Sequence, residues 1–147
     1  MKPDRLLRTL IVDDEPLARL RMHHLLHDHA DVRICGECGD ANAAAAAIAQ
    51  QEPDVVFLDI TLPGMSGLEL AREAGRNRRP LIILVTAHAE FALEAFECRA
   101  VDYLLKPVRP ERLAKALDRV REFMAATLAH PAPAAPSAAP APQTSQE

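Results

Sequence analysis

The chain has 147 residues, a length that suits one domain burying roughly two thirds of its unfolded surface. One Tyr, four Phe and no Trp predict an aliphatic core, and a net charge of −4 argues against a broad basic face for nucleic acid. No apolar run is long enough to span a membrane and no signal peptide opens the chain, so we expect a cytoplasmic protein whose three cysteines are reduced thiols.

The first third of the chain alternates apolar runs with helical patterns. A strand is expected over residues 6–12, ending in Asp13-Asp14-Glu15-Pro16. Because proline suits the first turn of a helix, a helix should follow over about 16–29. Its core-spaced residues are Ala18, Met22, Leu25 and Leu26. Residues 32–38 predict a weaker edge strand, and the alanine-rich 42–51 predicts a helix that is soft or lies close to the sheet.

The strongest pattern lies between residues 55 and 67. Four apolar residues run into Asp59, and a Pro63-Gly64 turn and Gly67 follow. An unbroken apolar run of this length predicts a strand buried on both faces of a parallel sheet. Ligands of such sheets bind at the carboxyl ends of the strands, and a carboxylate there is costly unless a cation or hydrogen bonds meet it. Asp59 is therefore the expected chemical centre.

The second half of the chain continues the alternation. The expected elements are a helix over about 67–74, a strand over 81–85, a short helix near 90–97, a strand over 101–105 and a helix from residue 110. Ser66 should cap the first of these helices and Gly75 should end it. The last helix carries Leu113, Leu117, Val120 and Met124 on one face. Five strand–helix units predict an α/β fold, a parallel sheet with helices on both faces and right-handed crossovers. From residue 130 onward the Pro- and Ala-rich composition predicts a disordered tether.

Polar groups close four of the five predicted strands. They are Asp13 and Asp14, Asp59, Thr86, and Lys106. In a parallel sheet these ends meet at one edge, where two carboxylates 4 Å apart repel by about 4 kcal/mol at an effective dielectric constant of 20. A hard divalent cation removes that cost, and oxygen ligands alone point to Mg²⁺. A lysine and a hydroxyl beside them could stabilise a phosphoryl group transferred to a carboxylate.

These motifs resemble the response-regulator receiver (CheY-like) family. The resemblance covers residues 6–128 and rests on the ordered set Asp13-Asp14, Asp59-x-x-x-Pro63-Gly64, Thr86-Ala87 and Lys106-Pro107. It implies a flavodoxin-like, doubly wound five-stranded parallel sheet in the order 2-1-3-4-5. The segments 15–19, 95–96 and 100–107 further resemble the LytTR (AlgR/LytR-like) subclass of transcription regulators.

The resemblance assigns roles to residues. Asp59 would accept phosphate from a phosphohistidine on a sensor histidine kinase. Asp14, Asp59 and the backbone carbonyl of Thr61 would hold Mg²⁺, with Asp13 acting through water. Lys106 would pair with the phosphoryl group, and its bond to Pro107 would be cis.

A switch is also implied. Thr86 would turn inward to a phosphoryl oxygen and Tyr103 would follow into the space it leaves. The movement would reshape the face formed by helix 4, strand 5 and helix 5, through which a homodimer could form. Residues 1–129 would be the receiver and 130–147 a tether to a missing C-terminal domain that binds DNA.

Two other functions fit parts of the pattern. A receiver could signal by docking alone, without phosphorylation, although the intact acidic pair and lysine argue weakly against it. An aspartyl-phosphate phosphatase of the haloacid-dehalogenase kind would use Asp59 as nucleophile. Such enzymes usually need a second aspartate two residues on, where this chain has Thr61, so we expect a signalling phosphoacceptor that is not an enzyme.

Several motifs have simpler interpretations. Cys35-x-x-Cys38 lacks a second pair or a histidine motif and is not expected to bind metal. His23 and His27 lie one helical turn apart and could chelate a metal, but solvated side chains are the simpler interpretation. Residues 76–79 are expected to form an exposed basic loop that could also contact an acidic partner. Neither Thr61 nor His88 offers a carboxylate or carboxamide to position water, so the phosphorylated form should last minutes or longer.

Overall fold

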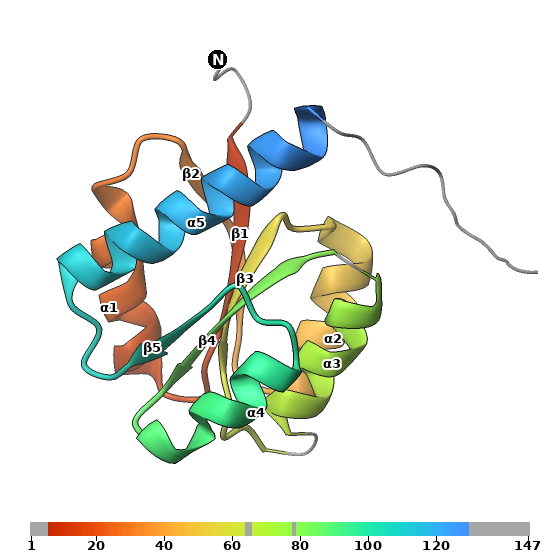
Figure 1. Ribbon diagram of the computed structural model, residues 1–147. Helices are drawn as coiled ribbons and strands as arrows, with labels where there is room; N and C mark the ends of the chain where they lie inside the picture. The colour runs from red at the N-terminus through yellow and green to blue at the C-terminus, as the bar shows by residue number, and fades with distance from the viewer. Residues whose placement is uncertain (1–5, 64–65, 78, 130–147) are drawn as a thin grey trace, which may run out of the picture.

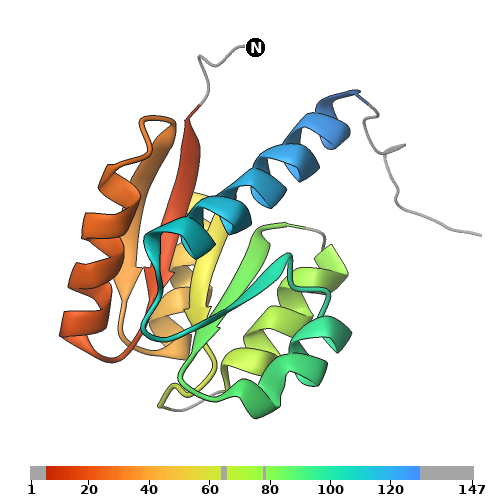
Figure 2. The same cartoon turned by 60° about the vertical axis from the view of Figure 1, so that its left-hand side comes forward.

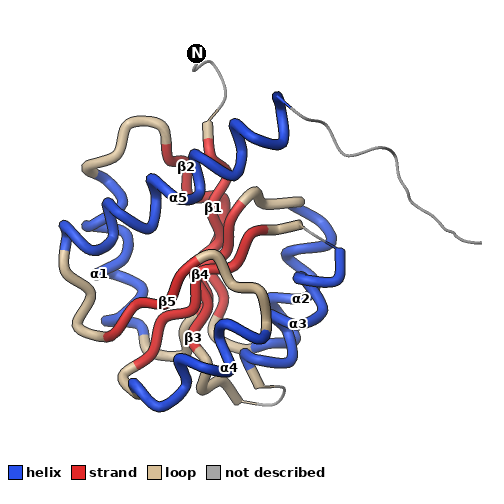
Figure 3. Tube along the Cα trace, in the orientation of Figure 1, coloured by secondary structure: helices blue, strands red, loops and turns tan. Residues whose placement is uncertain are grey.

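The computed structural model describes residues 6–63, 66–77 and 79–129. Five parallel strands form one sheet in the order β2-β1-β3-β4-β5 (Figure 3), which confirms the predicted fold class. The strands are β1 (Leu7–Val12), β2 (Val32–Cys38), β3 (Val55–Asp59), β4 (Leu81–Thr86) and β5 (Asp102–Leu105). The helices are α1 (Pro16–His27), α2 (Ala41–Gln51), α3 (Gly67–Asn77), α4 (Ala92–Glu97) and α5 (Pro110–Ala129), with a short 3-10 turn η1 (Ala89–Phe91) before α4. Within the described ranges no helix is both long and apolar enough to cross a membrane.

Helices cover both faces of the sheet. Figures 1 and 2 show α1 and α5 on one side and α2, α3 and α4 on the other. The central strand β3 supplies both layers, because successive side chains of a strand point to opposite faces. Val55 and Phe57 join the core under α1 and α5, whereas Val56 and Leu58 join the core under α2, α3 and α4. This double burial explains why β3 is apolar without interruption until Asp59.

Helical packing follows the spacing expected from the sequence. Met22, Leu25 and Leu26 of α1 are buried against the sheet, whereas Ala18 is only partly buried. The expected face of α5 is also confirmed, with Met124 packing partly buried at the edge of its cluster. Ala44 of α2 is fully buried, so this helix lies close to the sheet. Close packing was one of the two alternatives expected for this alanine-rich helix.

Several element ends differ from the expectation, and the ends of α1 and α3 are two of them. Helix α1 ends at His27 rather than at residue 29, and α3 continues through Gly75 to Asn77. A glycine inside a helix costs about 1 kcal/mol relative to alanine, which the burial of Leu70 and Ala74 on the same helix offsets. Gly75 therefore does not end α3. The predicted tether, residues 130–147, lies outside the described residues.

Candidate functional site

Three aspartates meet at the carboxyl edge of the sheet. Asp13 and Asp14 follow β1 and Asp59 ends β3, and these two strands are hydrogen-bonded neighbours. Each aspartate offers one oxygen, and the three oxygens lie within 4.8 Å of one another. Asp13 and Asp59 are buried, whereas Asp14 is exposed. The sheet order thus brings together the acidic residues that the sequence placed at strand ends.

Lys106 reaches into this acidic cluster. Its Nζ lies 2.8 Å from Oδ2 of Asp13 and 3.1 Å from Oδ2 of Asp59. The lysine follows β5, its backbone amide donates to the carbonyl of Thr86, and its bond to Pro107 is cis as expected. Although burial alone would lower it, the neighbouring carboxylates raise the pKa of Lys106 well above its ordinary value. The ammonium group therefore stays charged at every physiological pH.

Asp59 lies in surroundings that disfavour its charge. Only 4% of it is exposed, and this burial raises the pKa of its carboxyl above the usual value. The amide and the hydroxyl of Thr61 both donate to Oδ1, at 3.0 and 3.2 Å, and oppose the rise together with Lys106. One ammonium group does not balance three carboxylates. Mg²⁺, a small oxygen-binding cation, fits this donor set.

The turn after β3 depends on Gly67. A Cβ atom at this position would lie 2.2 Å from the backbone oxygen of Asp59, and the amide of Gly67 donates to the carbonyl of Ile60. Ser66 and Glu69 then form a capping box, in which Ser66 Oγ accepts from the amide of Leu68 and Glu69 accepts from the amide of Ser66. Gly67 and this cap fix the start of α3 directly beside Asp59.

Thr86 and Tyr103 are joined through the main chain of His88. Thr86 is fully buried at the end of β4, and its Oγ1 accepts from the amide of His88 at 3.2 Å. The Tyr103 hydroxyl donates to the carbonyl of His88 from the adjacent strand β5. The two predicted switch residues therefore both hydrogen-bond to the backbone of His88, at the beginning of the loop that leads into α4.

Sequence reasoning missed two contributors. Glu15 lies 3.4 Å from Lys106 Nζ, as a fourth carboxylate at the rim. Thr61, expected to act through its carbonyl, also holds Asp59 with its amide and hydroxyl. An acidic residue in the Asp-Asp-Glu-Pro run was visible, but nothing in the pattern indicated which way it would turn.

The described residues of the remaining motifs contribute no side chain to the acidic cluster, although the carbonyl of Cys38 accepts from the amide of Asp13 at 3.0 Å. Cys35, Cys38 and Cys98 are free thiols. The basic segment at 76–79 is not simply an exposed loop: Arg76 belongs to α3, and Arg79 pairs with the buried Asp54 at 2.8 Å. Residue 78 lies outside the described residues. A buried carboxylate needs a charged partner, which Arg79 supplies.

Comparisons with known proteins agree with the geometry. The family model "Response regulator receiver domain" matches residues 9–118. The Salmonella typhi protein named "Transcriptional regulatory protein BtsR" is 47% identical over 117 residues, which are 80% of this chain and 49% of that protein. The chain thus spans about half the length of the curated relatives it matches.

Solved structures are similar over most of their length. The signal receiver domain of the putative response regulator NarL from Mycobacterium tuberculosis has a TM-score of 0.73 and 30% identity, over 80% of this chain and 98% of that one. The response regulatory domain of mrkE from Klebsiella pneumoniae has a TM-score of 0.72 and 31% identity, over 84% and 99%. Because the family model matches residues 9–118, well over half of its length, this chain belongs to the response regulator receiver domain family.

Proposed function

We propose that Asp59 is the phosphoacceptor of this receiver and that a sensor histidine kinase phosphorylates it in a Mg²⁺-dependent reaction. The observation that carries the proposal is the approach of Lys106 Nζ and two further aspartates to a carboxylate that is buried at a strand end. Receiver domains are signalling phosphoacceptors rather than enzymes. Residues 1–129 would form this receiver and residues 130–147 its tether.

The transfer needs few protein groups. A carboxylate oxygen of Asp59 attacks phosphorus, the N–P bond of the phosphohistidine breaks, and its electron pair leaves with the imidazole. Lys106 pairs with the transferred phosphoryl oxygens. Asp14, Asp59 and the backbone carbonyl of Thr61 would hold Mg²⁺, with Asp13 acting through water, and the ion would supply positive charge that offsets the crowded oxygens.

The conformational change would begin at the hydrogen bonds that Thr86 and Tyr103 make with the backbone of His88. Thr86 Oγ1 accepts a hydrogen bond from the amide of His88, so its hydroxyl hydrogen can be donated to a phosphoryl oxygen once Thr86 turns. Tyr103 would then leave the carbonyl of His88 and move inward. Turning a 1:99 population into 99:1 by such a step requires about 5.5 kcal/mol of preference.

The face that would change exposes large apolar side chains. Three exposed side chains lie on α4 and at the end of β5: Leu93 (66% exposed), Phe96 (81%) and Leu105 (45%). Large exposed apolar side chains gathered on one face mark interaction surfaces. A homodimer through α4, β5 and α5 would cover them.

The kinase would dock on another face. A cavity of about 390 Å³ opens beside Lys106 and is lined by Leu17, Ala18, Met22 and Val108 among others. Leu17 is 80% exposed and lies close to Glu15 at the rim of the acidic cluster. An apolar helix that carries a phosphohistidine could rest there.

The whole protein would be a transcription regulator. The BtsR relatives carry that name, and this chain spans about half of their length. We propose a LytTR-type output domain that binds DNA beyond the tether, and a cytoplasmic location. Both proposals concern the whole protein and go beyond the residues that the structure describes.

One assay tests the proposal against its rivals. The protein is incubated with Mg²⁺ and acetyl phosphate, and the intact mass is followed with Asp59→Asn as the control. A stable adduct that Asp59→Asn abolishes supports the phosphoacceptor. Steady release of phosphate would instead support a phosphatase, and no adduct would support a receiver that signals by docking alone.

A further inference from the structure

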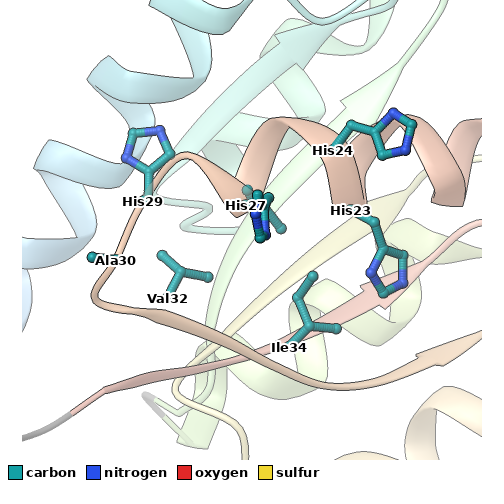
Figure 4. A pocket seen from close by; sticks show the side chains of 8 residues that line it. His23, His24, His27, His29, Ala30, Val32 and Ile34 are labelled. Carbon is teal, nitrogen blue, oxygen red and sulfur yellow. The ribbon is translucent and has the colours of Figure 1, made fainter.

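Four histidines gather at one end of α1, away from the acidic edge. They are His23, His24, His27 and His29, four of the six histidines in the chain. Together with residues of β2 they line a cavity of about 510 Å³ (Figure 4). The cavity shares no lining residue with the three aspartates. Nothing in the proposed phosphotransfer uses this group of imidazoles.

Two of the four rings lie on the same side of α1. His23 and His27 are four residues apart, a spacing that brings their Cβ atoms within about 5–6 Å on one face of a helix. Figure 4 shows both rings on the side of α1 towards Ile34 of β2, whereas the ring of His24 points away. Histidines at this spacing on one helix face can bind the same metal ion.

A third donor is already beside His23. Its Nε2 lies 2.8 Å from Oε2 of Glu37 on β2. The other oxygen of Glu37, Oε1, accepts a hydrogen bond from Nε of Arg19 at 2.7 Å, so Oε2 is the oxygen that faces His23. Two ligand atoms bound to one tetrahedral Zn²⁺ at about 2.0–2.1 Å lie roughly 3.3 Å apart. If the distance between Nε2 of His23 and Oε2 of Glu37 increased slightly, an ion could therefore replace the hydrogen between these two atoms.

We propose that His23, His27 and Glu37 bind a first-row transition-metal ion of the Zn²⁺, Ni²⁺ or Cu²⁺ type. Imidazole nitrogen suits these ions, whereas the all-oxygen cluster around Asp59 suits Mg²⁺. Among the described residues only the three aspartates bring three ligand atoms within 4.8 Å, so His27 has to turn about its side-chain torsions to close the site. The side chain of His27 is exposed, which leaves room for this turn. The bound ion would tie α1 to β2.

The test is a titration of the full chain with ZnCl₂. Excess Mg²⁺ keeps the aspartate cluster occupied, and Cys35→Ser with Cys38→Ser removes the nearby thiols. We expect saturable binding of one ion per chain, and ring ¹⁵N signals of His23 and His27 that shift on binding. His23→Ala and His27→Ala should each weaken binding roughly tenfold or more, and Glu37→Gln by a smaller factor.

His24→Ala is the matched control, because it removes an imidazole from the same helix turn without touching the site. Circular dichroism in EDTA checks that all variants fold alike. Binding that His24→Ala weakens as much as His27→Ala would overturn the proposal. Binding that is indifferent to His27 or to Glu37 would overturn it as well.

Discussion

Nζ of Lys106 lies 3.1 Å from Oδ2 of Asp59, although 47 residues separate the two in sequence. The contact exists because β4 hydrogen-bonds to both β3 and β5, so that the ends of these strands meet at one edge. Lys106 also lies 2.8 Å from Asp13 and is raised in pKa by both carboxylates. In the proposed reaction this charge would pair with the transferred phosphoryl group.

Replacing Lys106 by alanine should slow phosphorylation. The variant loses the ammonium that would stabilise charge on the transferred phosphoryl group, a loss typically worth a factor of about 10²–10³ in rate. The initial rate of adduct formation from acetyl phosphate, followed by intact mass, measures the effect. Lys115→Ala, an exposed position on α5, is the matched control. An unchanged rate for Lys106→Ala would remove the lysine from the reaction.

Mg²⁺ should stabilise the fold. An ion that binds only the folded chain adds about 2.7 kcal/mol to the free energy of unfolding when present at 100 times its dissociation constant. Urea denaturation with Mg²⁺ and with EDTA measures the difference. Asp14→Asn should abolish most of it without harming the apo fold, because Asp14 is exposed. Asp28→Asn, also exposed, serves as the control and should keep the full response.

Gly67→Ala should destabilise the protein and disturb the site together. The added Cβ would meet the backbone oxygen of Asp59 at 2.2 Å, so the start of α3 must move. Overpacking of this kind costs about 1–3 kcal/mol. The midpoint temperature of thermal unfolding and the phosphorylation rate should therefore both be lower in this variant. Gly39→Ala is the matched control, since its Cβ would meet only the end of the Arg19 side chain at 3.5 Å.

Asp102 and Arg112 should govern acid stability on the α5 side. Burial alone would raise the pKa of Asp102, but two hydrogen bonds from Arg112, at 2.9 and 2.6 Å, lower it overall. A carboxyl with a lowered pKa in the folded state adds stability that is present above its unfolded pKa. That stability is lost as the pH falls through the folded pKa. The wild type should therefore lose this contribution only below about pH 4.

Arg112→Met reverses the dependence. It leaves Asp102 buried without its main partner and should cost about 2 kcal/mol at pH 7, a figure reduced from that of a fully buried pair because Arg112 is 39% exposed. The deficit should shrink as the pH falls towards 4, where Asp102 takes up a proton. Urea denaturation at several pH values measures both trends. A deficit that does not change with pH, or one that Asp102→Asn fails to relieve, would contradict this account.

The sequence determined the scaffold well for a physical reason. β3 is apolar on both faces up to Asp59, which predicts a strand buried between two layers, and the alternation of strand and helix patterns predicts the parallel sheet. The positions of Asp13, Asp59, Thr86 and Lys106 at strand ends then followed from the topology.

Contacts that depend on the direction of a side chain could not be predicted from the sequence. Neither the turn of Glu15 towards Lys106 nor the pairing of Arg79 with Asp54 leaves a periodic signal. The extension of α3 past Gly75 escaped for a related reason. Helix ends depend on whether packing outweighs a local cost of about 1 kcal/mol, and single-residue preferences do not show that balance.

Phosphorylated Asp59 should persist for minutes or longer after the donor is removed. Hydrolysis needs a water molecule held in line with the phosphorus, and the positions two residues beyond Asp59 and Thr86 supply no carboxylate or carboxamide. Thr61 is exposed and its hydroxyl donates to Asp59, while the His88 ring is 52% exposed and lies 3.7 Å from Glu90.

Thr61→Asn tests this explanation by placing a carboxamide there, and Thr61→Val is the control that removes the hydroxyl without adding an acceptor. We expect the asparagine variant to lose its phosphoryl group roughly tenfold faster or more, since a carboxamide that holds the attacking water in line removes part of the entropic cost of positioning it. The mass of the adduct, followed after the donor is removed, gives both lifetimes. A wild-type lifetime of seconds would contradict the prediction. A valine variant that then decays as fast as the wild type would show that a group other than Thr61 positions the water.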